Sequence, residues 1–350
     1  MEIEDRRAFL YWAGLLKFHL QFRRYRLPFL SPVRTAHGPW AEREGLLVRL
    51  ESADRRVGWG DAAPVPPYSR ESVDKAEAAC RALGSMVDHE SLVAAPAPSL
   101  VAALRAAESD MLWDRQPEAT DDSRFLPVSA LLPAGAAGIK ALRRIAGSDF
   151  RTFKWKVGVY DPADELALLD DVCAELPPGG RLRLDANGAW DRRNAERWMG
   201  RCADYPVEFV EQPAGRGADD LLRGLAADFP TPVALDESIA SDGEIDRWLS
   251  SGWPGIFVVK PSLLEDAGGV LARLGAAGAS VVFSSALETA IGARAALRAA
   301  FDWKGESRAI GFGVWPLFSD PAFDGPAARP FFTRADGERL NPQNLWNALN

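Results

Sequence analysis

The stretch TFKWKV, residues 152–157, places two lysines in a segment that otherwise has the composition of a buried strand. Lys154 and Lys156 alternate with aromatic residues, and side chains two residues apart in a strand point to the same face. We therefore expect the two lysines to share one face, while Trp155 packs against helices on the other. Charges are rare in buried strands, so this pair predicts a functional site.

Similar short apolar segments recur along the chain on both sides of this stretch, separated by stretches with helical periodicity. They are FLPVSALL (125–132), TFKWKV (152–157), LRLDA (182–186), VEFVE (207–211), PVALD (232–236), GIFVVK (255–260), SVVFSS (280–285) and RAIGFG (308–313). Eight parallel strands with helical crossovers predict a TIM-like (β/α)-barrel over 125–314. Because this region is shorter than the ~250 residues typical of the fold, we expect a helix to be missing or several to be reduced, as in a (β/α)7β barrel.

The region before the barrel, 1–124, has a different rhythm. Alternation over 17–50 predicts a small antiparallel meander, and two helical patterns follow it. The segments 31–43, with an exposed-looking Trp40, and 58–72, which presents Tyr68, have the Pro/Gly-rich profile of loops that carry specificity. We expect an α+β capping domain, with the tail 315–350 packing back onto it.

Composition limits the possible partners. The 350 residues carry a net charge of −8, with a pI near 5.2, which argues against nucleic acid or an anionic membrane as partner. We expect a small-molecule carboxylate instead. Three widely spaced cysteines and no recognisable signal peptide or transmembrane span favour the cytoplasm. The sequence does not indicate an oligomeric state.

Charged residues stand at the carboxyl ends of the predicted barrel strands. From Lys156 onward they are spaced by 29, 26, 25 and 24 residues, which is the βα period. The set is Lys154, Lys156, Asp185, Glu211, Asp236 and Lys260. Each carboxylate alone could be a turn residue or a helix N-cap. Together they should converge on one mouth of the barrel, where catalytic groups of this fold gather.

Three converging carboxylates would repel one another without a counter-ion, so Asp185, Glu211 and Asp236 predict a divalent cation site. Ligation by oxygen alone favours magnesium over zinc. Arg183 and Asn187 follow the alternation on the same side as Asp185 and are candidate contacts of the ligands or the substrate.

Two lysines on one face, roughly 7 Å apart, should repel by roughly 2 kcal/mol at an effective dielectric near 20. That repulsion would lower the pKa of one lysine toward neutrality and suit it to general-base catalysis. No nucleophile and no phosphate-binding glycine loop is evident, so the proton should come from a carbon next to a carboxylate. The product of that step would be a metal-stabilised enediolate.

The motifs KWK (154–156), DAN (185–187), EQP (211–213), DES (236–238) and KP (260–261) resemble the muconate-lactonising subgroup of the enolase superfamily. The resemblance covers nearly the whole chain. It implies magnesium on the three carboxylates, with manganese as a possible substitute. It also implies Lys156 as the base that later protonates the leaving hydroxide, Lys154 as its tuning partner and Lys260 as a cation against the substrate ring.

Two further stretches, 58–72 and FSSALETAIG (283–292), resemble the members of this subgroup that act in menaquinone biosynthesis. The implied reaction is dehydration of 2-succinyl-6-hydroxy-2,4-cyclohexadiene-1-carboxylate, with Ser284, Ser285 and Gly311 contacting the succinyl chain and the capping loops closing over the site. GFGV at 311–314 departs from the subgroup: it lacks the Leu-Asp-Thr of many such dehydratases and the acidic pair of dipeptide epimerases.

Two alternatives remain. An N-acylamino-acid racemase could use the same lysines to exchange an α-proton from either side. An inactive barrel kept as a binding protein is the other, and the retention of all six charged residues argues against it.

Overall fold

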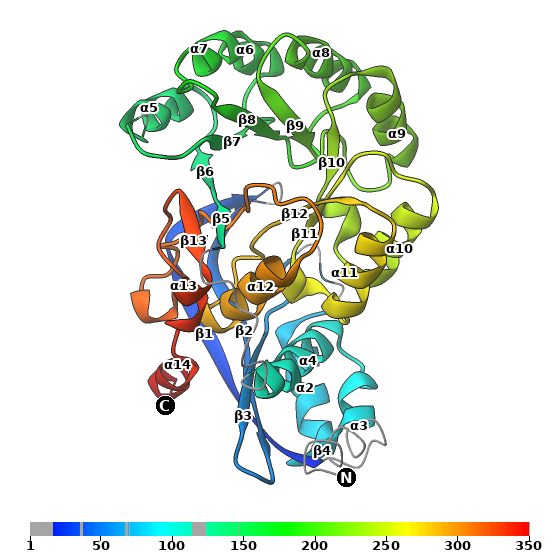
Figure 1. The fold of residues 1–350 in the computed structure, drawn as a ribbon, viewed down its shortest axis with the longest axis vertical. Helices are drawn as coiled ribbons and strands as arrows, with labels where there is room; N and C mark the ends of the chain where they lie inside the picture. Colours follow the sequence, from blue (N-terminus) through cyan, green and yellow to red (C-terminus); the bar gives the residue numbers. More distant parts are fainter. Residues whose placement is uncertain are drawn as a thin grey trace.

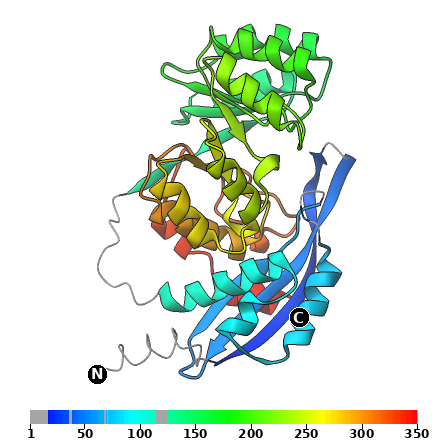
Figure 2. The same cartoon turned by 90° about the vertical axis from the view of Figure 1, so that its right-hand side faces the viewer.

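A computed structural model describes residues 17–35, 38–66, 69, 71–113, 124–145 and 147–349 (Figures 1 and 2). It contains an antiparallel sheet flanked by helices and a parallel sheet surrounded by helices. The two parts contact each other directly, and the last segment of the chain packs against both.

The antiparallel sheet has the strand order β3-β2-β1-β4. Its strands are β1 (Lys17–Thr35), β2 (Gly38–Ser52), β3 (Val57–Ala62) and β4 (Met86–Asp88). The predicted meander is therefore present, but the loop predicted at 31–43 is wrong. The β1–β2 ladder continues there to the pair formed by Thr35 and Gly38, after a register shift that accommodates Pro32. Trp40 packs edge-to-face on Phe29 at 5.1 Å, which anchors this polar-looking segment.

Helices α2 (Val73–Leu83), α3 (His89–Val93) and α4 (Pro98–Trp113) cover one face of this sheet. Strand β3 approaches α4 so closely that a Cβ on Gly58 or Gly60 would lie 1.8 or 1.9 Å from a carbonyl oxygen of α4. Glycine is therefore required at both positions, because backbone contacts backbone there. Helices α2 and α4 were predicted from their periodicity. The short helix α3, of five residues, was not.

The parallel sheet has seven strands in the order β12-β11-β10-β9-β8-β7-β6. Its strands are β6 (Ser129–Leu132), β7 (Thr152–Lys156), β8 (Arg181–Asp185), β9 (Val207–Glu211), β10 (Val233–Leu235), β11 (Ile256–Val259) and β12 (Ser280–Phe283). The eighth predicted strand consists of two isolated parallel bridges, one between Ser284 and Gly311 and one between Val128 and Ile310. These bridges join the two edge strands and close the barrel, confirming the (β/α)7β prediction.

The crossover helices lie outside the strands (Figure 1). They are α5 (Ala136–Ile145), α6 (Pro162–Ala167), α7 (Leu169–Ala174), α8 (Arg192–Cys202), α9 (Asp219–Asp228), α10 (Asp242–Ser250), α11 (Ala267–Ala276) and α12 (Ala290–Asp302). Three 3-10 helices span Glu237–Ile239, Pro261–Leu263 and Pro321–Phe323. Trp155 is fully buried and packs against Trp198 of α8 at 6.2 Å, so the prediction that it faces the helices is confirmed.

The segment predicted as one strand at 125–132 is divided in two. Strand β5 (Phe125–Pro127) pairs with β13 (Phe331–Thr333), and only the second half enters the barrel as β6. Helices α13 (Arg334–Glu338) and α14 (Pro342–Ala348) end the chain. Trp346 of α14 packs on Trp59 of β3 at 5.4 Å, so the tail does contact the first region. The domain limits at 124 and 314 stay predictions.

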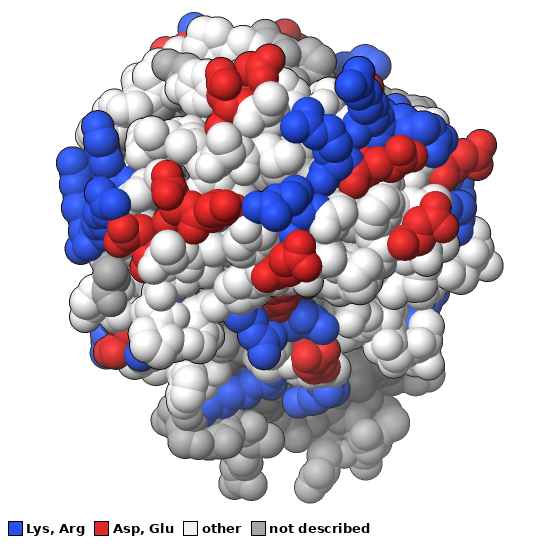
Figure 3. Space-filling view, turned by 90° about the horizontal axis from the view of Figure 1, so that it is seen from above, with Lys and Arg blue, Asp and Glu red and all other residues white. Residues whose placement is uncertain are grey.

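Within the described ranges, none of the helices combines the length and the apolar character needed to cross a membrane. Figure 3 shows one face of the molecule, on which Lys and Arg side chains are interleaved with Asp and Glu. On this face the charges of the two signs neutralise one another locally, and they do not form a continuous basic surface.

Candidate active site

The sheet order fixes the relative positions of the charged strand ends. Counting the closing segment as the eighth strand, β7 and β11 stand four strands apart in a ring of eight, and β8, β9 and β10 lie between them on one side. The lysines of β7 and Lys260, which follows β11, therefore face each other across the barrel mouth. The three predicted metal ligands occupy the arc between them.

Lys154 lies between two of those ligands. Its Nζ atom is 2.9 Å from Asp185 Oδ2 and donates to Glu211 Oε1 at 2.7 Å. Burial alone would lower the pKa of Lys154, but the two carboxylates outweigh burial and raise the pKa above its usual value. Lys156 ends β7, pairs in register with Asp185 and is half-buried.

Lys260 is in the opposite electrostatic situation. Its ammonium donates to Asp236 Oδ1, yet burial lowers the pKa of Lys260 to about 8, against the raising effect of Glu211 and Asp185. Repulsion between Lys154 and Lys156 was expected to lower the pKa of one of them, but the pKa of Lys154 moves the other way. The lowered pKa belongs to Lys260, which is outside that pair, and burial is its main cause.

The three carboxylates fit a hard cation by chemistry, although they are not gathered into a finished ligand cluster. Across the described residues, no group of three His, Cys, Asp or Glu side chains converges closely enough to hold a metal as it stands. The Lys154 ammonium lies between Asp185 and Glu211, where a metal ion would bind, and the Lys260 ammonium lies beside Asp236. Donor atoms that are all carboxylate oxygens suit Mg²⁺, which would have to displace these ammonium groups.

Two residues near the ligands were not singled out from the sequence. Gln212 Oε1 accepts from the backbone N–H groups of Asp236 and Ser238 at 3.0 and 3.2 Å, which fixes the start of the DES segment. Burial, followed by the charge of Asp185, raises the pKa of Glu237 to about 7. The signal for both was their place in the EQP and DES motifs beside a predicted ligand.

Asn187 lies beside Asp185, just beyond the end of β8. Its backbone N–H donates to Asp185 Oδ1 at 3.2 Å and its Nδ2 atom donates to Glu237 Oε1 at 3.0 Å. Its own Oδ1 is buried and has no hydrogen-bond partner among the described residues. Asn187 and Gln212 both have positive φ, 44° and 40°, so the backbone is strained beside two of the three ligands.

Arg183 lies deeper in the barrel than expected for a substrate contact. It is 1 % exposed, donates to Glu208 Oε2 at 2.7 Å and to the Ala309 carbonyl at 2.6 Å, and its guanidinium lies over the Phe209 ring. Alternation correctly placed Arg183 on the same face as Asp185. It does not show how deep in the barrel a residue lies, and Arg183 is one layer below Asp185. These contacts give it a structural role within the barrel.

The residues expected at the far end of the substrate do come together. Ser284 and Gly311 are bridge partners, and the Ser285 N–H donates to the Gly311 carbonyl at 3.3 Å. A Cβ on Gly311 would lie 2.7 Å from Ser284 Oγ, so glycine is needed for this approach. In the departing segment GFGV, Phe312 is fully buried and stacks on Trp315. Tyr68 lies outside the described residues.

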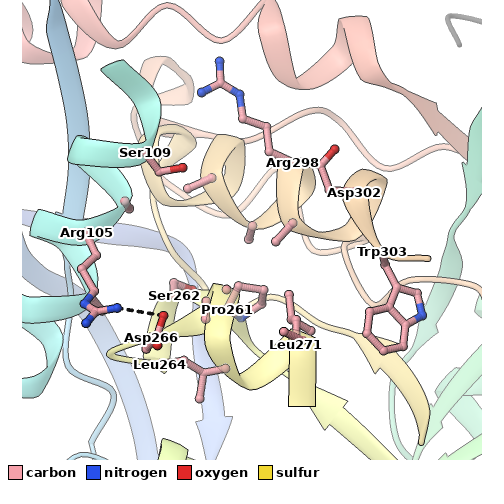
Figure 4. A pocket seen from close by; sticks show the side chains of 18 of the residues that line it. Arg105, Ser109, Pro261, Ser262, Leu264, Asp266, Leu271, Arg298, Asp302 and Trp303 are labelled. Atoms are coloured by element: carbon pink, nitrogen blue, oxygen red, sulfur yellow. Dashed lines mark ion pairs between the residues drawn. The ribbon is translucent and has the colours of Figure 1, made fainter. Parts of the chain in front are cut away.

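A cavity of about 930 Å³ lies away from the charged strand ends. It is a crevice between α4 and the helices α11 and α12, crossed by the Arg105–Asp266 ion pair at 2.8 Å (Figure 4). Several of its charged groups are engaged in pairs such as Arg298 with Asp110. The strand ends, where the lysines and carboxylates converge, therefore remain the candidate active site.

Comparison with known proteins agrees with the fold. Residues 137–327, more than half of the 350 residues, match the family described as Enolase C-terminal domain-like, and residues 18–111 match MenC, N-terminal domain. The chain is also similar to the L-Ala-D/L-Glu epimerase of Bacillus subtilis, with a TM-score of 0.75 over 90% of this chain and 95% of that one. At 21% identity that likeness shows the fold alone.

A barrel with opposed lysines and three intervening carboxylates defines an enzyme of the enolase superfamily. The chain is 38% identical to the o-succinylbenzoate synthase of Thermosynechococcus vestitus over 84% of its length and 92% of that relative, and 32% identical to that of Edwardsiella ictaluri over 77% and 82%. The Thermosynechococcus elongatus synthase, solved with Mg in its active site, superimposes with a TM-score of 0.77 at 36% identity, covering 94% and 99%. The chain belongs to the o-succinylbenzoate synthase family of that superfamily.

Proposed function

We propose that the chain dehydrates 2-succinyl-6-hydroxy-2,4-cyclohexadiene-1-carboxylate to 2-succinylbenzoate, a step of menaquinone biosynthesis. The observation that carries the proposal is the pair of lysine positions on opposite walls of the barrel mouth with carboxylates between them. This arrangement suits removal of a proton next to a carboxylate that is held between the two walls. The similarity to synthases of this activity identifies the substrate.

Asp185, Glu211 and Asp236 hold Mg²⁺ in this proposal. The metal, when bound, supplies Lewis-acid charge for the substrate carboxylate as its α-carbon is deprotonated. The support from this structure is that Asp185 and Glu211 already share one cation, the Lys154 ammonium. Mn²⁺ has the same preference for oxygen ligands and should substitute.

Lys156 removes the proton from the carbon that bears the carboxylate. The C–H electron pair enters the ring, the bond to the neighbouring hydroxyl breaks, and Lys156 returns its proton to the departing oxygen, so that water leaves and the ring becomes aromatic. Lys154 adds positive charge on the same wall. Lys260 faces the ring from the opposite wall and stabilises its developing negative charge.

Ser284, Ser285 and Gly311 contact the succinyl chain, and Tyr68 contributes from the capping loop. The contacts among Ser284, Ser285 and Gly311 support a joint role for these three. We also propose a small-molecule partner, supported by the net charge of −8, and a cytoplasmic location, supported by the three widely spaced cysteines.

Product analysis with two substrates tests the proposal. The purified protein with Mg²⁺ is given the cyclohexadiene and, separately, single enantiomers of N-succinyl amino acids. We expect 2-succinylbenzoate from the first at a rate well above the uncatalysed one. Racemisation of the amino acids without dehydration would favour the N-acylamino-acid racemase, which the opposed lysines also permit. Inactivity toward both would leave a binding protein.

A further inference from the structure

The loop that joins β12 to α12, residues 284–289, is held from outside the barrel by Arg43 of β2. Arg43 is 1 % exposed, and its guanidinium donates to four carbonyl oxygens. Two belong to the segment after β3, Ala63 at 2.6 Å and Pro64. Two belong to the barrel loop, Leu287 at 3.1 Å and Ala286 at 3.4 Å. One buried cation therefore joins the capping sheet to the active-site loop.

The loop has an unfavourable backbone conformation at the point that Arg43 holds. Leu287 has a φ of 59°, in the left-handed region that branched, bulky residues rarely adopt. Arg43 donates to the carbonyl oxygen of Ala286, which precedes Leu287, and to the carbonyl oxygen of Leu287 itself. A strained conformation persists only where surrounding contacts enforce it, and these carbonyl contacts are suited to do so.

A second residue of the capping sheet fixes the end of the same loop. Asp61 of β3 accepts hydrogen bonds from the N–H and Oγ1 of Thr289, the N-cap residue of α12, at 2.9 and 2.8 Å. Tyr25 donates to the other oxygen of Asp61 at 2.8 Å. The N-terminus of α12 is thus capped by a carboxylate from the antiparallel sheet. A negative charge at a helix N-terminus stabilises the helix electrostatically.

Inside the loop, the strained turn is connected to Ser285. The Leu287 N–H donates to Ser285 Oγ at 2.9 Å, and Ser285 Oγ donates to Glu288 Oε2 at 2.9 Å. A change in the backbone at Leu287 would therefore reorient the Ser285 hydroxyl. On the crevice side, by contrast, the Arg105–Asp266 ion pair joins two side chains (Figure 4).

We infer that Arg43 is a positioning residue: it keeps Leu287 in its left-handed conformation and thereby sets Ser284 and Ser285 for the succinyl end of the substrate. This inference rests on the proposed function for what the loop contacts. The contact between the capping sheet and the loop is independent of it. Arg43 acts through the loop and does not reach the reacting atoms.

The test is Arg43→Lys, alone and combined with changes at Leu287. Lysine keeps the charge but cannot reach four carbonyls with a planar fork. We expect kcat/KM on the cyclohexadiene to fall at least tenfold, with the Mg²⁺ affinity unchanged. Adding Leu287→Gly, which adopts positive φ without strain, should recover most of the loss. Leu287→Ala also removes the side chain beyond Cβ but keeps the backbone strain. We therefore expect it not to recover the lost kcat/KM.

Unchanged kcat/KM in Arg43→Lys, or equal recovery by glycine and alanine, would overturn the inference. Hydrogen exchange of the 285–289 amides gives a readout that needs no substrate: exchange should be faster in Arg43→Lys and slower again with glycine added. If the wild type does not turn over the cyclohexadiene, the proposed function fails, while the exchange data still decide on Arg43.

Should Arg43→Lys fail to fold, the Leu287 variants in the wild-type background replace it. Leu287→Gly should then melt at a higher temperature than Leu287→Ala, the reverse of the usual order of these residues. An alanine variant as stable as the glycine variant would show that no strain is held there and would contradict the inference.

Discussion

Lys154 and Lys156 are identical residues on one face of one strand, yet their surroundings differ. Lys154 is engaged by Asp185 and Glu211, which raise its pKa and keep it charged. Held in this way, Lys154 is unsuited to accept a proton, which agrees with the proposed role of Lys156 as the base. The order of the two lysines could be seen in the sequence, but the contacts of Lys154 with Asp185 and Glu211 could not.

Lys260 should not be replaceable by arginine. Its ammonium is largely buried beside Asp236, and a planar guanidinium does not reproduce the compact charge of an ammonium. We expect Lys260→Arg to lower kcat by about 10²-fold, the scale of losing one electrostatic stabiliser, with little change in the melting temperature. Steady-state kinetics checks this, and a rate near that of the wild type would argue against close contact with the ring.

Glu288 should make stability depend on pH. Burial raises its pKa from the usual 4.5 to about 7, and its Oε1 has no hydrogen-bond partner among the described residues. Between those values the folded protein keeps a proton that the unfolded chain has lost. The contribution of Glu288 to stability is thus fully present below pH 4.5 and falls as pH rises to 7, by at most about 3 kcal/mol.

Glu288→Gln isolates this effect, because glutamine resembles the protonated acid at every pH. The free energy of unfolding of the variant, relative to that of the wild type, should be about 2–3 kcal/mol higher at pH 8 than at pH 5. Denaturant unfolding at the two pH values measures it. A constant difference would mean that Glu288 titrates normally.

At this scale the sequence predicted the six charged residues because their spacing follows the βα period. It overestimated Arg183, since alternation gives the face of a strand but not the depth within a barrel. It did not single out Glu237, whose Oε1 accepts from Asn187 Nδ2 at 3.0 Å. That contact joins the ends of two strands, which no local pattern contains.

Among the elements, long periodic segments were predicted well and irregular ones were not. Six of the predicted barrel strands match β7 to β12 within about two residues, whereas the eighth is only a pair of bridges. Polar and proline residues at 31–43 suggested a loop, but cross-strand pairing and the contact of Trp40 with Phe29 keep this segment in the sheet. Tertiary packing overrode local composition.

The contact of β3 with α4 should be intolerant of any side chain. A Cβ on Gly60 would lie 1.9 Å from the Ala103 carbonyl oxygen, so Gly60→Ala forces two backbones apart and should cost about 2–3 kcal/mol. The matched control is Gly224→Ala in α9, where nothing lies within 4 Å of the new Cβ. That change should be neutral or stabilise by up to about 1 kcal/mol. Equal melting temperatures for the two variants would contradict this close packing.

The whole molecule brings the two parts together at the active-site loop. Residues far apart in the sequence meet there, such as Arg43 with Leu287 and Asp61 with Thr289. The sequence predicted a capping region and a returning tail, but not these contacts, because they depend on the placement of two separately folded layers.

Removal of the metal should affect activity and stability together. A chelator should abolish turnover, and Mg²⁺ or Mn²⁺ should restore it. At 100 times its dissociation constant, Mg²⁺ should also stabilise the fold by about 2.7 kcal/mol. Mg²⁺ should therefore raise the melting temperature of the wild type and of the control Asp149→Asn, which changes an exposed residue. It should not raise that of Asp185→Asn. Turnover that is indifferent to chelator would exclude the proposed role of the three carboxylates.

The most direct test of the account is the turnover of Lys156→Ala on the cyclohexadiene. General-base catalysis contributes about 10²–10⁴-fold, so loss of the proposed base should lower the rate by at least about 10³-fold. The variant should keep its melting temperature and its response to Mg²⁺. A folded, Mg²⁺-binding Lys156→Ala protein with a rate within tenfold of the wild type would contradict the central claim, because the proton would then have another acceptor.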